Sequence, residues 1–306
     1  MLVCPSCSWM VFRSAPAECA RLAALAGCSC GIVRCMADVV ERTVRVLHRL
    51  HDELVDLAGQ LSEAEARAQS YCDEWSVAQV YSHLGSGAEI GREELSAASA
   101  GEDPPARESI WARWDALEPA EMVRRFAPSD ARYLEVIDDL LEAGGPAPEE
   151  IRVPLHGWSL DLQTFLVFRL LEVGLHQWDV QVVREPTVEV DTEAAQLLLQ
   201  AYPLQFVGQA ADSSVAQRIG PAVVRTEIAD VARTVDIVVG TPVMVMRDGQ
   251  LPETVKSLSV TTVAIPTAGT WCRSLSGRLD PAHTPAALSI RGPVHLNDLR
   301  HLFPGG

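Results

Sequence analysis

A glutamate and a histidine, Glu172 and His176, stand four residues apart within an apolar stretch that runs from Phe165 to Val183. A helix over this stretch would place both side chains on one face, one turn apart. A carboxylate and an imidazole are two of the ligands that zinc takes in proteins. The pair therefore predicts half of a metal site; the alternative is an acid and a base on a solvated helix face.

A third candidate ligand, His83, lies on a second helix that is predicted to begin after Ser76. Ser76 and Gln79 have the spacing of a capping box, and apolar neighbours on the same helix would turn His83 inward. Helical bundles build metal sites from inward side chains on facing helices. His83, Glu172 and His176 would leave one position of a tetrahedral zinc ion open, which is the arrangement of catalytic zinc sites.

Three segments, in chain order, resemble the mycothiol-dependent maleylpyruvate isomerase family of the DinB-like superfamily. They are Cys72-x-x-Trp75 followed by His83-Leu84, then Glu172-x-x-x-His176-x-Trp178-Asp179, and finally Gly277-Arg278-Leu279-Asp280-Pro281. The resemblance covers about residues 36 to 306 and is loose from Arg184 to Thr262.

The resemblance implies an enzyme that binds a divalent metal, most simply zinc, and uses mycothiol as a thiol cosubstrate. Zinc would hold the thiol as a thiolate, which would add to a small electrophile, such as a carboxylate-bearing keto acid. Addition to a conjugated cis double bond, rotation and elimination would give cis–trans isomerisation. Release of the adduct would instead make the chain a mycothiol S-transferase, and a DinB-like metal-binding protein without catalysis is a further alternative.

Two more residues match the family segments. Arg278 would bind a substrate carboxylate through its planar guanidinium; its alternative is a surface ion pair with Asp280. Asp179, three residues after His176, would accept a hydrogen bond from that imidazole and orient it. Its alternative is a surface acid at a helix end.

Composition limits the partners and the compartment. The net charge of −16 argues against nucleic acid and anionic membranes as partners, and no stretch reaches the ~20 apolar residues of a membrane span. Only two of the eight cysteines, Cys72 and Cys272, follow Met36, which suits a reducing cytoplasm. Lys256 is the only lysine, and this bias towards arginine suits a GC-rich, actinobacterial source.

The pattern predicts a two-domain α+β protein. Residues 1–35 show no amphipathic pattern and are expected to be disordered, or to precede the true start at Met36. Residues 36–186 are expected to form a DinB-like four-helix bundle, with helices over 37–60, 76–97, 129–141 and 159–183 and a short helix opened by Pro119.

Residues 187–306 are expected to form an α+β domain on a mostly antiparallel sheet. The periodicity predicts helices over 191–207, 268–275 and 296–303. Alternating runs predict strands over 223–228, 235–239, 243–246, 260–265 and 287–291.

Overall fold

In the computed structural model, residues 29–142, 150–155 and 158–305 are described, with side chains from residue 38 onward. Two compact units divide between Val183 and Arg184. The protein is α+β with a mostly antiparallel sheet, as predicted. The expectation for residues 1–28 lies outside the described residues, whereas residues 29–35, which were also expected to be disordered or to precede the true start, belong to a helix.

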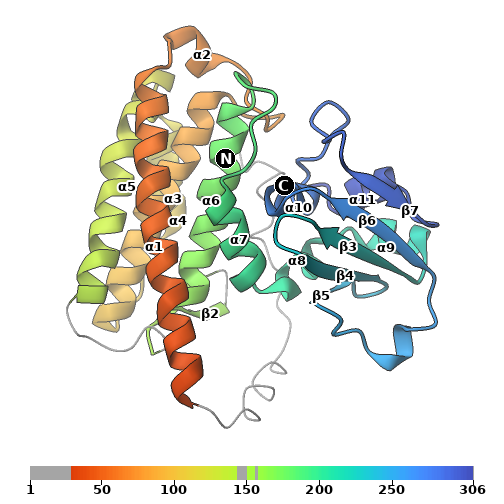
Figure 1. The fold of residues 1–306 in the computed structure, drawn as a ribbon. Helices are drawn as coiled ribbons and strands as arrows, with labels where there is room; N and C mark the ends of the chain where they lie inside the picture. The colour runs from red at the N-terminus through yellow and green to blue at the C-terminus, as the bar shows by residue number, and fades with distance from the viewer. Residues whose placement is uncertain (1–28, 143–149, 156–157, 306) are drawn as a thin grey trace. The chain divides into compact units, whose positions relative to one another are not determined.

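The first unit is built mainly from helices (Figure 1). They are α1 (Ser29–Gly59), α2 (Glu63–Arg67), α3 (Val77–Ala100), α4 (Arg107–Asp115), α5 (Pro119–Glu142) and α6 (Leu162–Gln181). Helix α1 packs against α5 and α6, and α3 also packs against both. Their facing stripes are apolar: Leu50, Leu84 and Ile137 are fully buried, and this burial holds the helices together.

Capping side chains set the starts of α3 and α6. Ser76 and Gln79 form the predicted capping box at α3. The helix predicted to begin at residue 159 begins at Leu162 instead, because residues Trp158–Asp161 form strand β2, which pairs with β1 (Arg152–Leu155). Asp161 caps α6 instead and accepts a hydrogen bond from the Thr164 amide at 2.7 Å, as carboxylates do at helix N-termini.

Helix α5 runs continuously where the sequence predicted two helices. Pro128 lies inside it, although proline removes a backbone hydrogen bond and costs roughly 3 kcal/mol in a helix interior. Burial on both sides of the proline, at Phe126 and Tyr133, outweighs this cost. The neighbouring Ser129 hydroxyl also donates to the Gly85 carbonyl of α3, at 2.8 Å.

The second unit surrounds a five-stranded sheet of order β5-β4-β3-β6-β7, in which only the β3–β6 pair is parallel. The strands are β3 (Ala222–Ile228), β4 (Arg233–Val239), β5 (Met244–Arg247), β6 (Val260–Ile265) and β7 (Ser289–Arg291). The helices are α7 (Thr192–Ala201), α8 (Leu204–Ala210), α9 (Ser213–Ile219), α10 (Ala268–Ser274) and α11 (Leu296–Leu302), with a 3-10 turn at Glu253–Val255. The predicted helix over 191–207 is interrupted at Pro203, which starts α8.

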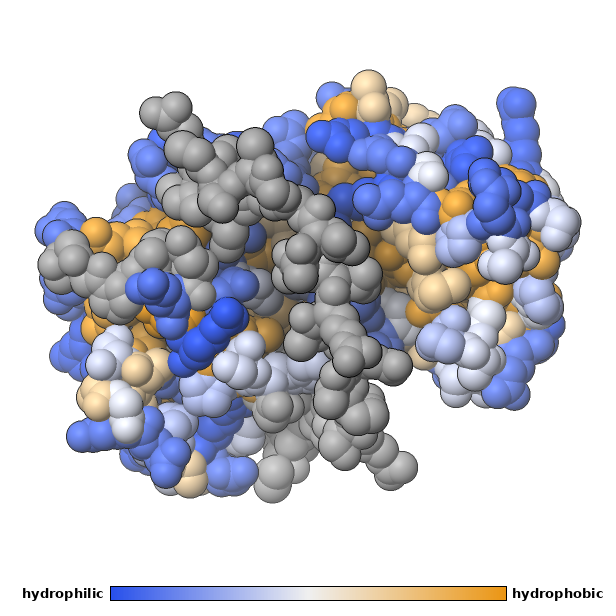
Figure 2. Space-filling view, turned by 90° about the horizontal axis from the view of Figure 1, so that it is seen from below, coloured by the Kyte–Doolittle hydropathy of each residue, from blue (hydrophilic) through white to orange (hydrophobic). Residues whose placement is uncertain are grey.

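The face drawn in Figure 2 mixes hydrophilic and hydrophobic residues. Among the residues described, the large hydrophobic side chains that are exposed are Leu141, Val183 and Val260. None of the helices in the described ranges combines the length and the apolar character that a membrane span requires.

Candidate metal centre

The structure brings the three predicted ligands together. Glu172 and His176 lie one turn apart on α6, and His83 reaches them from α3. The His83 Nε2 atom lies 2.9 Å from Glu172 Oε2, and His176 Nε2 lies 3.7 Å from the same oxygen. The side chains of His83 and Glu172 are about a quarter exposed and that of His176 is buried.

These distances fit the donor set of a divalent ion. Ligands at the roughly 2.0–2.1 Å bond lengths of tetrahedral zinc lie about 3.4 Å from one another. The separations of the two imidazole nitrogens from Glu172 Oε2 lie on either side of that value, and the three candidate ligand atoms lie within 4.8 Å of one another. Two imidazole nitrogens and one carboxylate oxygen could therefore hold an ion with small side-chain movements.

A second group of possible ligands, Cys72, His176 and Asp179, uses the other nitrogen of the same imidazole. His176 Nδ1 lies 2.8 Å from Asp179 Oδ2, which also accepts a hydrogen bond from the Cys72 thiol at 3.2 Å. Asp179 is completely buried. Its carboxylate therefore fixes the imidazole so that Nε2 faces Glu172, and Asp179 is not the surface acid of the alternative.

The loop before α3 places Cys72 and Trp75 beside these residues. The Tyr71 amide donates to the Asp179 carbonyl at 3.1 Å, and the Trp75 amide donates to the Cys72 carbonyl at 2.9 Å. The Trp75 ring lies 4.8 Å from the His83 ring and 5.8 Å from the His176 ring, between ring centres. The Trp75 ring therefore restricts the rotation of both imidazole rings.

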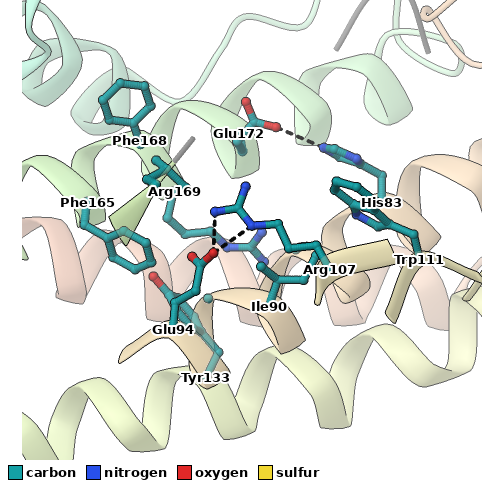
Figure 3. Close-up of a pocket in the computed structure, with 13 residues that line it drawn as sticks. His83, Ile90, Glu94, Arg107, Trp111, Tyr133, Phe165, Phe168, Arg169 and Glu172 are labelled. Atoms are coloured by element: carbon teal, nitrogen blue, oxygen red, sulfur yellow. Dashed lines mark hydrogen bonds and ion pairs between the residues drawn. The ribbon is translucent and has the colours of Figure 1, made fainter. Parts of the chain in front are cut away.

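A pocket of about 100 Å³ begins at His83 and Glu172 and extends between α3, α4, α5 and α6 (Figure 3). Its other lining residues are Gly87, Ile90, Gly91, Glu94, Arg107, Trp111, Tyr133, Leu155, Phe165, Phe168 and Arg169. The candidate ligands are therefore reachable from a cavity within the helical unit.

Both arginines of the pocket are paired with buried carboxylates. Arg107 donates from Nε to Glu94 at 2.8 Å, and from Nη2 to the same oxygen. Burial raises the pKa of Glu94, and the Arg107 guanidinium opposes that rise. Arg169 donates to Asp130 at 2.6 Å. Burial opposes ionisation of Asp130, but the Arg169 guanidinium and the hydrogen bonds from His51 and Arg169 prevail and lower its pKa.

Arg278 lies in the second unit, just after α10. Its side chain is buried, its Nη1 donates to the Ser276 carbonyl at 2.9 Å, and its amide donates to the Arg273 carbonyl at 3.0 Å. It is therefore not the surface arginine of the alternative expectation. Its predicted role in binding a substrate carboxylate stays a prediction.

Sequence reasoning missed two parts of this site. Cys72 was given no role beyond its place in a family segment; it is buried and donates to Asp179. The pocket was not predicted, because residues such as Glu94 and Tyr133 have no motif. One signal was present: the helix that carries His83 also has Gly87 and Gly91 on the same face.

Fold and site together define a class of protein: a helical unit with a two-histidine, one-glutamate candidate metal centre, joined in sequence to an α+β unit. Residues 47–181 match the sequence family described as the mycothiol maleylpyruvate isomerase N-terminal domain. The resemblance predicted from the sequence is thus confirmed over this part of the chain.

Two solved structures are similar in fold. One is the crystal structure of the mycothiol-dependent maleylpyruvate isomerase, with a TM-score of 0.53, 16% sequence identity, and coverage of 78% of this chain and 89% of that chain. The other is a mutant of the same enzyme with a histidine changed to alanine, at the same TM-score and coverage and 15% identity. At this identity the likeness shows the fold. None of the curated proteins matches the chain significantly.

Proposed function

We propose that the chain is a mycothiol-using, metal-dependent enzyme, with His83, Glu172 and His176 holding one divalent ion, most simply zinc. The observation that carries the proposal is the convergence of these three side chains from α3 and α6 at the mouth of a pocket. We also assign α1, α3, α5 and α6 to a DinB-like four-helix bundle.

The protein's own residues have separate tasks in this proposal. A bound divalent ion would supply the charge that keeps a thiol ionised at neutral pH. Asp179 holds the Nδ1 side of His176, so that Nε2 is presented to the ion. Trp75 packs against the imidazoles of His83 and His176 and excludes water from that side. The pocket leaves space beside the ligands for an electrophile.

The proposed reaction is maleylpyruvate-isomerase-like cis–trans isomerisation of an electrophile. The thiolate adds to a conjugated double bond, the resulting single bond rotates, and elimination returns the thiol and the trans isomer. Arg278 is our candidate for binding a carboxylate of the substrate. Mycothiol S-transfer is the alternative, since the same ligands would serve both reactions; product analysis separates them, because only isomerisation regenerates free thiol.

Elemental analysis of the purified protein, followed by titration with mycothiol, tests the proposal. We expect about one zinc per chain in the parent protein, and a sharp loss of metal in the His83→Ala variant. His48→Ala is the matched control, because His48 pairs with Asp138 on the surface of the same unit. Full metal content in His83→Ala would remove His83 from the ligand set. Metal binding without thiol-dependent turnover would leave the non-catalytic alternative.

A further inference from the structure

The pocket beside the candidate metal centre has a lining poorly suited to a charged ligand. Most of the surface is apolar or aromatic, from Ile90, Trp111, Tyr133, Leu155, Phe165 and Phe168. The guanidinium groups of Arg107 and Arg169 are paired with Glu94 and Asp130, which are 2% and 3% exposed. A carboxylate could recruit either arginine only by leaving a buried acid without its cation, which is strongly unfavourable.

Two of the residues that line the same pocket, Tyr133 and Arg169, each carry a buried hydrogen-bond donor. The Tyr133 hydroxyl and the Arg169 Nε have no hydrogen-bond partner within the described part of the chain. Burial raises the pKa of Tyr133, so its hydroxyl keeps its proton. Because unsatisfied buried donors are costly, the pocket favours a ligand that brings an acceptor atom to them.

The size of the pocket suits a ring or a short branched chain. Its volume is about 100 Å³, compared with roughly 150 Å³ for a dry protein cavity that binds benzene. Gly87 lines the pocket, and a Cβ added there would lie 3.0 Å from Arg169 Nη1, so a larger residue would crowd this side of the pocket.

We propose that this pocket binds an uncharged, ring-sized apolar group of the electrophilic substrate, and that this group carries a hydrogen-bond acceptor such as a carbonyl oxygen. The acceptor takes a hydrogen bond from the Tyr133 hydroxyl, the donor that Tyr133→Phe removes. This inference rests on the proposed function, and it narrows the substrate class: any carboxylate of the substrate lies outside this pocket.

Three probes with a common ring test the proposal: acetophenone, toluene and benzoate. Their binding to the full chain, as purified with its metal and without thiol, is measured by ligand-observed NMR titration. Acetophenone should bind at least tenfold more tightly than benzoate. Benzoate binding as tightly as acetophenone would overturn the proposal, and this comparison needs no variant.

Two variants locate the binding. Tyr133→Phe should lower the affinity for acetophenone three- to tenfold and change the affinity for toluene less than twofold, because only acetophenone offers an acceptor. Gly87→Val should lower the affinities for acetophenone and toluene by more than tenfold. Tyr81→Phe is the matched control, since the buried Tyr81 hydroxyl donates to the Leu54 carbonyl and is not part of the pocket lining; it should change neither. Unchanged acetophenone affinity in Tyr133→Phe would overturn the acceptor assignment, and unchanged toluene affinity in Gly87→Val would place the ring elsewhere.

Failure of this inference can be distinguished from failure of the proposed function. Thiol-dependent turnover in a protein that does not bind acetophenone would overturn the pocket assignment alone. Acetophenone binding with the expected variant pattern, but without any thiol-dependent turnover, would overturn the proposed function and leave the pocket as a binding site for an uncharged ring.

Discussion

Two clusters of histidine and acid in the helical unit use similar residue types in different ways. In the first, Asp130 lies between Arg169 and His51, with contacts of 2.6 Å and 2.8 Å. In the second, Glu172 faces two imidazoles. A guanidinium has no lone pair to offer a metal, so the arginine makes the first cluster a buried ion pair. The second has only ligand-type groups, which suits it to an ion.

The largest expected effect is the loss of stability when the ion pair of the first cluster is broken. Arg169→Met leaves Asp130 buried without its main cation and should lower the free energy of unfolding by about 3–5 kcal/mol. Urea denaturation measures this change. Arg124→Met removes an exposed arginine from α5 and should cost less than about 0.5 kcal/mol. A cost below 1 kcal/mol for Arg169→Met would mean that Asp130 is held by other groups.

The ion pair of Asp130 with Arg169 should also affect how stability depends on pH. The pKa of Asp130 lies below its ordinary value of 3.8 in the folded protein, so its contribution is complete above pH 3.8 and is lost as the pH falls through the folded value. The stability difference between the parent and Arg169→Met should therefore be constant near neutral pH and shrink in acid. A difference that grows as the pH falls would contradict the ion pair.

At the second cluster, the expected effect is on metal affinity. Asp179→Asn removes the carboxylate that orients His176 and should weaken zinc binding by roughly 10–100-fold, measured by competition with a chelator. Asp138→Asn changes the surface acid that pairs with His48 at 3.0 Å and should leave the affinity unchanged. Equal effects of the two variants would remove the special role of Asp179.

The smallest expected effect concerns Cys72. Cys72→Ser keeps a donor for Asp179, so we expect zinc affinity to change by less than about threefold. Cys72→Val removes the donor at similar volume and should weaken zinc binding somewhat more, by roughly the net worth of one hydrogen bond, about 1 kcal/mol. A loss of metal in both variants would instead point to the thiol as a direct ligand.

The sequence predicted the parts of the fold that depend on local chemistry. The cap at Ser76 and the alternating strands of the second unit are encoded in neighbouring residues, and the structure has β3 and β6 where they were predicted. The errors lie where packing overrides a local signal: Pro128 stays inside a helix, and Ser159 lies in a strand.

The candidate site divides in the same way. Glu172 and His176 could be paired from the helical period, and the capped helix pointed His83 inward. The other parts of the site depend on residues that are remote in sequence. Cys72 contacts Asp179, and Tyr133 lines the pocket together with residues of other helices. No local pattern encodes those distances, so the convergence of the three candidate ligands could be predicted and the pocket could not.

His83 and Glu172 are 89 residues apart in the chain, and this separation makes the candidate site a reversible cross-link. Loading it would tie α3 to α6 and close a long loop, so the free energy of metal binding would add to that of folding. At a free metal concentration 100 times the dissociation constant, the gain is about 2.7 kcal/mol. The free metal concentration would then determine the stability of the folded chain as well as its reactivity.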